Sequence, residues 1–197
     1  MQAENMRPTQ VEAPLLLVDV DGVLNAVVAP PFATLKAGGT SSGVFEAEFT
    51  ARNFPIRVPV GTREQIAELQ SLFECVWATT WEDNAAEHLS PVLGFGADWP
   101  VIRFHDDFPD AGTWKLPAVQ RFAELPENQS RALAWIDDDL QPDALEWTAH
   151  RTRAGVHTLM VRPEANVGFT SRHFQRLLAF HADHQRAAAQ VSPLPHP

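Results

Sequence analysis

The segment Leu15–Val20, together with the residues that follow it, constrains the fold of this chain more than any other feature. Five of its six residues are apolar, a pattern typical of a short strand buried on both faces of a parallel sheet. The acids Asp19 and Asp21 end this run, and Gly22 allows a sharp turn and a close approach to a ligand. Open α/β sheets bind ligands at the carboxyl ends of such strands. Taken alone, however, the motif fits a simple Asp-Gly turn equally well.

Length and composition indicate one domain without a strongly basic surface. The chain has 197 residues, enough to bury a core. Its formal net charge of -10 argues against sequence-independent binding to nucleic acid or to an anionic membrane. The single cysteine, Cys75, excludes an intrachain disulfide, and no apolar run approaches the length of a membrane span. We therefore predict a cytoplasmic protein, since residues 1–13 also lack the apolar core of a signal peptide.

The periodicity of apolar residues predicts alternating strands and helices. Strands are expected over residues 15–20, 75–80, 101–104, 132–136 and 156–161, and helices over 63–73, 83–90, 116–125, 142–153 and 171–188. Residues 62–65 have the spacing of a capping box at the start of the first helix. The series predicts an α/β fold, a Rossmann-like three-layer sandwich with a mostly parallel sheet. This core domain would span residues 14–189, between a loose leader at 1–13 and a disordered tail at 190–197.

A small insert is expected directly after the acidic motif, at about residues 26–61. It contains a Gly/Ser-rich stretch that is typical of a loop. Apolar and polar residues alternate over 45–49 and again over 54–58, which predicts a β-hairpin. We expect a flap or cap that is too small to be an independent domain.

Three predicted strands end in groups capable of chemistry, and parallel strands end at one edge of a sheet. These groups are Asp19 and Asp21, Thr79 and Thr80, and Asp137 and Asp138. Two unit charges 4 Å apart repel by about 4 kcal/mol at an effective dielectric near 20, so four such acids require a cation. Oxygen ligands without a histidine or cysteine cluster suit Mg²⁺ better than Zn²⁺. Lys115, at the start of a predicted helix, would add a positive charge, and the set would suit a phosphate group.

In this order and on these elements, the motifs resemble those of the haloacid dehalogenase-like (HAD) superfamily. The four matching motifs are Asp19-Val20-Asp21-Gly22-Val23, Thr79, Lys115 and Asp137-Asp138. They span residues 15–139, and the implied fold continues to about residue 189. Each motif is weak alone, whereas all four in order are fairly specific.

The resemblance implies a Mg²⁺-dependent phosphatase that hydrolyses a phosphate monoester. Asp19 would be the nucleophile that forms an aspartyl-phosphate. Asp21 would protonate the leaving oxygen and then activate water, and its backbone carbonyl would join Asp19 as a metal ligand. Asp138 would bind the metal directly, and Asp137 directly or through water. Lys115 would pair with Asp19 and the phosphate. Because the dehalogenase branch lacks an acid two residues after the nucleophile, Asp21 favours phosphoryl transfer to water.

Several assignments stay open at this point. Thr79 or Thr80 would hydrogen-bond a phosphoryl oxygen, and we favour Thr79 because it ends the apolar strand directly. Lys36 is the only other lysine that could replace Lys115, because the chain has two. Asp139 is the third acid of a run in which two are needed.

The identity of the substrate is less constrained than the chemistry. Trp81 and Trp114 flank the second and third motifs, and each could line a substrate pocket or pack in the core. We expect a small phosphorylated substrate, with nucleic acid and membrane unfavoured as partners. A phosphotransferase or mutase of the same fold, or a non-catalytic HAD-fold binding protein, are the alternatives. No recognisable pattern specifies the oligomeric state.

Overall fold

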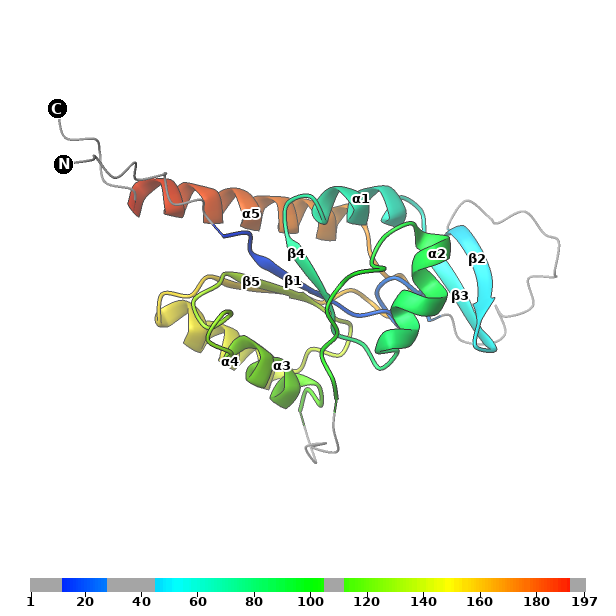
Figure 1. Ribbon diagram of the computed structural model, residues 1–197, viewed down its shortest axis with the longest axis horizontal. Helices are drawn as coiled ribbons and strands as arrows, with labels where there is room; N and C mark the ends of the chain where they lie inside the picture. The colour runs from blue at the N-terminus through cyan, green and yellow to red at the C-terminus, as the bar shows by residue number, and fades with distance from the viewer. Residues whose placement is uncertain (1–11, 28–44, 105–111, 192–197) are drawn as a thin grey trace, which may run out of the picture.

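The computed structural model describes residues 12–27, 45–104 and 112–191, and over these ranges the chain is a mixed α/β structure (Figure 1). A four-stranded parallel sheet has the order β4-β1-β5-β6. Its strands are β1 (Leu15–Val18), β4 (Glu74–Trp77), β5 (Leu133–Ile136) and β6 (Thr158–Val161). The two central strands are buried throughout, as their apolar runs predict.

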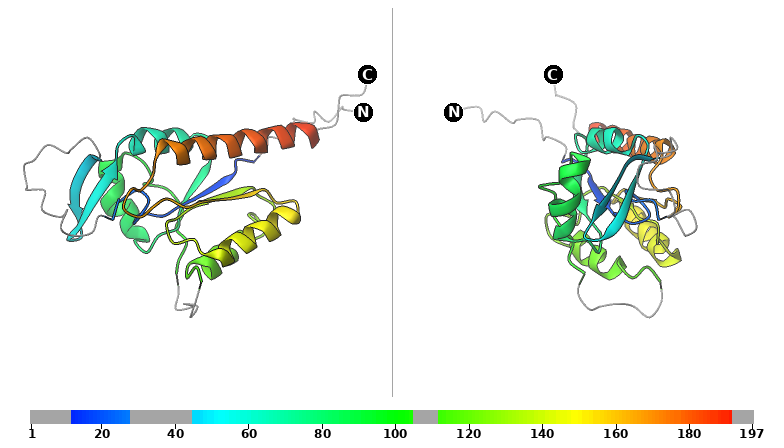
Figure 2. Two further views of the ribbon diagram at one scale, coloured as in Figure 1. Left: turned by 180° about the vertical axis from the view of Figure 1, so that it is seen from behind. Right: turned by 90° about the vertical axis from the view of Figure 1, so that its right-hand side faces the viewer.

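Helices lie on both faces of this sheet (Figures 1 and 2). They are α1 (Thr62–Leu69), a π-helical segment η2 (Ala85–Leu89) that continues into α2 (Ser90–Leu93), α3 (Leu116–Ala123), α4 (Pro142–Arg153) and α5 (Ser171–Val191). Because side chains alternate along a strand, β1 serves two cores. Leu16 packs in the core that includes Leu69 and Leu177, whereas Leu17 packs in the core that includes Val119 and Ala144.

The predicted hairpin is present as the antiparallel pair β2 (Phe45–Ala51) and β3 (Phe54–Pro59). It lies at the end of the molecule opposite the C-terminal end of α5 (Figures 1 and 2). Ile56 and Val58 are buried in the same core as β1, which attaches the hairpin to the sheet. The hairpin therefore stands beyond the carboxyl ends of the parallel strands, where ligands bind in such folds.

The predicted capping box at residues 62–65 is wrong. Thr62 is the first residue of α1, and its buried hydroxyl has no hydrogen-bond partner within the described part of the chain. Glu46 of the hairpin satisfies the helix start instead, accepting bonds of 2.9 Å from the N–H of Gly61 and 2.7 Å from that of Arg63. The Gln65 side chain donates to Ser171 at 2.9 Å rather than reaching back along α1. A contact distant in sequence has replaced the local cap.

Other element boundaries also differ from the sequence prediction. The strand expected over 101–104 is reduced to a single bridge between Trp77 and Val101. The helix expected over 83–90 begins as the π-helical segment and continues beyond that range. Most of the predicted leader, part of the flap and most of the tail lie outside the described residues.

Among the residues that the structure describes, no helix combines the length and apolarity needed to cross a membrane.

Candidate active site

The carboxyl ends of β1 and β5 bring Asp19 and Asp137 side by side. Val18 is paired with Ile136 in the last pair of this ladder, and Asp19 and Asp137 directly follow these two residues. The Asp19 N–H donates to the carbonyl of Ile136 at 3.1 Å, and the Asp137 N–H donates to that of Val161 at 3.1 Å. Both acids are buried, at 4% and 0% exposure. The main chain of the sheet thus holds two carboxylates out of water.

Lys115 joins these two acids. Its Nζ lies 2.7 Å from Oδ2 of Asp19 and 2.7 Å from Oδ2 of Asp137. Burial raises the pKa of Asp19 to about 7, with Lys115 opposing the shift and Asp137 adding to it. Burial would lower the pKa of Lys115, but attraction to the two acids outweighs it and raises that pKa. Lys115 directly precedes α3, as predicted.

Asp138 completes a cluster of three acids. One ligand oxygen from each of Asp19, Asp137 and Asp138 lies within 4.8 Å of the other two. Gly22 makes this possible, because its φ is 76° and a Cβ there would overlap the Asp138 carboxylate. Partial burial and the charge of Asp137 raise the pKa of Asp138. Arg162 donates at 2.9 Å to the Asp138 carbonyl, which helps to fix this segment.

The cluster has the donor set of a hard divalent cation. Three carboxylates oppose one lysine, and all potential ligand atoms are oxygens, which suits Mg²⁺. Both carboxylate oxygens of Asp137 already accept hydrogen bonds: Oδ2 accepts from Lys115, and Oδ1 accepts from the Asp139 N–H at 2.9 Å. Asp139 lies outside the cluster, and its Oδ1 accepts from Gln141 at 2.7 Å. Asp19 and Asp138 are therefore the acids best placed to bind a metal directly.

Asp21 occupies a separate, half-buried position with both carboxylate oxygens engaged. Trp81 Nε1 donates to Oδ2 at 2.9 Å, and Asn25 Nδ2 donates to Oδ1 at 2.8 Å. Asn25 is itself held, because its Oδ1 accepts from the Arg57 N–H at 2.8 Å. The carboxylate of Asp21 therefore has a fixed orientation. Asn25 was missed from the sequence, where the only signal is an amide four residues after the acid in a turn.

The two candidate hydroxyls after β4 differ in environment. Thr79 is fully buried, and its Oγ1 accepts from the Trp81 N–H at 3.3 Å. Thr80 is exposed and lines two adjoining cavities. The cavity lining favours Thr80 as the hydroxyl that would contact a ligand, whereas the position at the strand end favoured Thr79.

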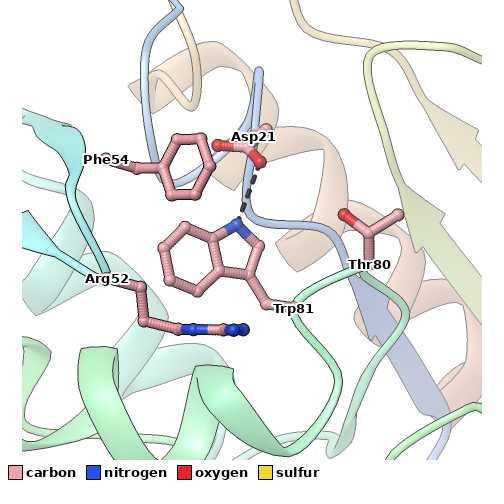
Figure 3. Close-up of a pocket in the computed structure, with 5 residues that line it drawn as sticks. All are labelled: Asp21, Arg52, Phe54, Thr80 and Trp81. Carbon is pink, nitrogen blue, oxygen red and sulfur yellow. Dashed lines mark hydrogen bonds between the residues drawn. The ribbon is translucent and has the colours of Figure 1, made fainter.

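The two cavities meet at Asp21 and Thr80. One, of about 230 Å³, adjoins the acid cluster, and its lining includes Asp19, Asp21, Thr80, Trp114, Lys115 and Asp138. The other, of about 170 Å³, is lined by Asp21, Arg52, Phe54, Thr80 and Trp81 (Figure 3). Each tryptophan predicted to line a pocket therefore lines one cavity. Arg52 and Phe54, at the hairpin tip, were missed, because no local pattern shows that this tip reaches the site.

Trp114 forms one wall beside Lys115. The Lys115 Nζ lies 5.5 Å from the centroid of the indole, within cation–π distance. The Phe104 ring packs against Trp114 at 5.2 Å. Lys36, the rival to Lys115, lies outside the described residues.

The residues of the four predicted motifs thus lie along the carboxyl edge of one parallel sheet. No family model, no curated protein and no solved structure matches this chain. We therefore infer the chemistry of the site from its side chains alone.

Proposed function

We propose that this protein is a Mg²⁺-dependent phosphatase of the HAD-like superfamily, with a Rossmann-like fold and a small phosphate monoester as substrate. One observation carries the proposal: Lys115 lies 2.7 Å from both Asp19 and Asp137, and Asp138 adjoins them. A buried carboxylate paired with a lysine at a sheet edge is arranged as a fixed nucleophile beside a phosphate site.

Asp19 would attack the phosphorus atom, forming an aspartyl-phosphate as the ester bond breaks. Lys115 holds Oδ2 of Asp19, which fixes the carboxylate and supplies positive charge for a phosphoryl oxygen. Asp21 would give a proton to the leaving oxygen. It would then take a proton from water, whose oxygen attacks the phosphorus and releases phosphate from Asp19. The bonds from Trp81 and Asn25 hold Asp21 in position for both transfers.

Asp19 and Asp138 would hold Mg²⁺, with Asp137 binding directly or through water and the Asp21 carbonyl as a further ligand. A bound Mg²⁺ would neutralise charge on the phosphoryl oxygens during transfer. Burial raises the pKa of Asp19 to about 7 even beside Lys115, so part of this acid would be protonated near neutral pH. A neighbouring cation favours the charged carboxylate, which is the nucleophilic form.

The first experiment is hydrolysis of phenyl phosphate with Mg²⁺ or with EDTA, comparing the wild type, Asp19→Asn and Asp98→Asn. Asp98 is an exposed acid outside both cavities and serves as the matched control. We expect turnover that requires Mg²⁺, is lost in Asp19→Asn and is retained in Asp98→Asn. Calorimetric titration with Mg²⁺ accompanies the assay. Absence of both turnover and Mg²⁺ binding would overturn the catalytic proposal and favour a non-catalytic protein.

Added acceptor alcohols would separate hydrolysis from the phosphotransferase alternative. A phosphatase releases inorganic phosphate in proportion to substrate consumed, whereas a transferase yields a new ester. The cytoplasmic location stays a prediction.

A further inference from the structure

We propose that the cavity of about 170 Å³ at the hairpin tip binds the leaving group of the ester, and that this leaving group is a planar ring carrying a negative charge. This inference rests on the proposed phosphatase function, and names its substrate class. Arg52, Phe54 and Trp81 would be the residues that recognise the ring and its charge.

The position of the cavity follows from Asp21. Asp21 and Thr80 line both this cavity and the one that contains Asp19 and Lys115. In the proposed reaction, Asp21 protonates the oxygen that joins the leaving group to phosphorus. The phosphoryl group would lie beside Lys115, so the remainder of the ester extends past Asp21 into the hairpin cavity.

Arg52 provides a positive charge for an anionic substituent. Within the described ranges, the Arg52 guanidinium has no hydrogen bond or ion pair. It lacks an acidic partner in this part of the structure even though the chain has a formal net charge of -10. Guanidinium groups bind carboxylates and phosphates through paired donors. Arg52 also has a φ of 48° in a two-residue turn, where Asn or Gly is preferred. The turn itself gives no reason for an arginine here, whereas ligand binding does.

Phe54 and Trp81 provide apolar surface for a ring. Phe54 is 62% exposed, although its ring contacts the buried Trp81 at a centroid distance of 6.1 Å and an interplanar angle of 71°. Trp81 Nε1 already donates to Asp21, so the indole offers its ring to a ligand (Figure 3). An engineered cavity of about 150 Å³ accommodates benzene, so this volume fits one ring.

The test uses four esters that vary ring and charge independently: phenyl phosphate, 4-carboxyphenyl phosphate, ethyl phosphate and 3-carboxypropyl phosphate. Each variant is compared with the wild type on the same ester, so that intrinsic leaving-group reactivity cancels. We expect Arg52→Gln to lower kcat/KM about tenfold for 4-carboxyphenyl phosphate and less than about twofold for phenyl phosphate. Phe54→Ala should lower kcat/KM about tenfold for both aryl esters and less than about twofold for ethyl phosphate.

Arg52→Lys and Arg153→Gln serve as controls. The first retains the charge and should keep part of the preference for the carboxylated ring. The second removes an exposed arginine at the end of α4, outside both cavities, and should change no ester selectively. Circular dichroism verifies that each variant folds. Equal effects of Arg52→Gln on all four esters, or none, would overturn the inference while leaving the phosphatase proposal intact.

A binding assay separates failure of the inference from failure of the proposed function. Calorimetry with 4-hydroxybenzoate, the free leaving group, requires no catalysis and uses the wild type and Arg52→Gln. We expect weak binding that is reduced about tenfold in Arg52→Gln. Such binding without turnover of any ester would contradict the phosphatase proposal while supporting the ring-binding cavity. Turnover of the esters with no Arg52-dependent binding and no ester preference would contradict the cavity assignment alone.

Discussion

The Nε1 of Trp81 donates a hydrogen bond of 2.9 Å to Oδ2 of Asp21, and so connects the segment after β4 to the turn after β1. If Asp21 is the acid and base of the reaction, Trp81 is its positioning residue. We expect Trp81→Phe, which keeps a ring and removes the donor, to lower kcat roughly tenfold with little change in the KM for ethyl phosphate. Steady-state kinetics with this small ester avoids ring contacts in the hairpin cavity.

Trp99→Phe is the matched control for this substitution. Trp99 packs against Trp77 at a centroid distance of 4.6 Å and lines neither cavity near Asp21. It should lose little kcat. Mg²⁺ affinity, measured by calorimetry, should be unchanged in both variants, because the Trp81 indole bonds the Asp21 carboxylate, which is not one of the clustered acids Asp19, Asp137 and Asp138. A loss of Mg²⁺ affinity in Trp81→Phe would contradict a role confined to Asp21.

Valine substitutions distinguish the two hydroxyls that follow β4. Thr79→Val removes the buried acceptor of the Trp81 N–H, at a cost of about 1–3 kcal/mol in the free energy of unfolding. Thr80→Val should leave stability nearly unchanged, because Thr80 is exposed, and should lower kcat/KM about tenfold by removing a donor in both cavities. Thermal unfolding and ester hydrolysis measure the two effects. Unchanged kinetics in Thr80→Val, with kcat/KM lost in Thr79→Val, would assign the phosphoryl contact to Thr79.

Acidification should weaken the packing of α5. Burial against Phe180, at a ring distance of 4.3 Å, lowers the pKa of His157 below its ordinary 6.5, with His184 adding to the shift and Asp183 opposing it. The folded state therefore favours neutral imidazole. Its contribution to stability is complete above about pH 6.5 and is lost as the pH falls through the folded pKa. We expect the Tm to fall between pH 7 and pH 5.

His157→Gln tests the origin of this pH dependence. The variant should show a smaller fall in Tm than the wild type between these pH values, because its side chain does not titrate. His150→Gln, which changes an exposed residue of α4, is the control and should behave as the wild type. An identical pH dependence in His157→Gln and the wild type would assign the effect to other groups.

The sequence predicted the candidate site residues that follow sheet strands. It did not predict the residues that reach the site from distant segments. A buried strand that ends in an acid specifies a position at the carboxyl edge, so Asp19 and Asp137 could be placed together. The pairing of Lys115 with Asp19 was expected from the family resemblance, whereas its contact with Asp137 was not predicted. Arg52 could not be assigned, because hairpin periodicity does not specify where the tip packs. Glu46 was missed for the same reason, since it caps a helix that begins sixteen residues later, at Thr62.

Gly22→Ala should damage the proposed metal site and the fold through one added methyl group. The new Cβ would overlap the Asp138 carboxylate and would occupy a backbone with a φ of 76°. We expect Mg²⁺ affinity to fall at least about tenfold as Asp138 moves, and stability to fall by about 1–2 kcal/mol. Gly155→Ala separates the two effects, because its φ is 87° and a Cβ there meets nothing within 4 Å. It should lose similar stability while keeping its Mg²⁺ affinity. Equal Mg²⁺ affinities in the two variants, measured by calorimetry below their unfolding temperatures, would remove Asp138 from the metal site.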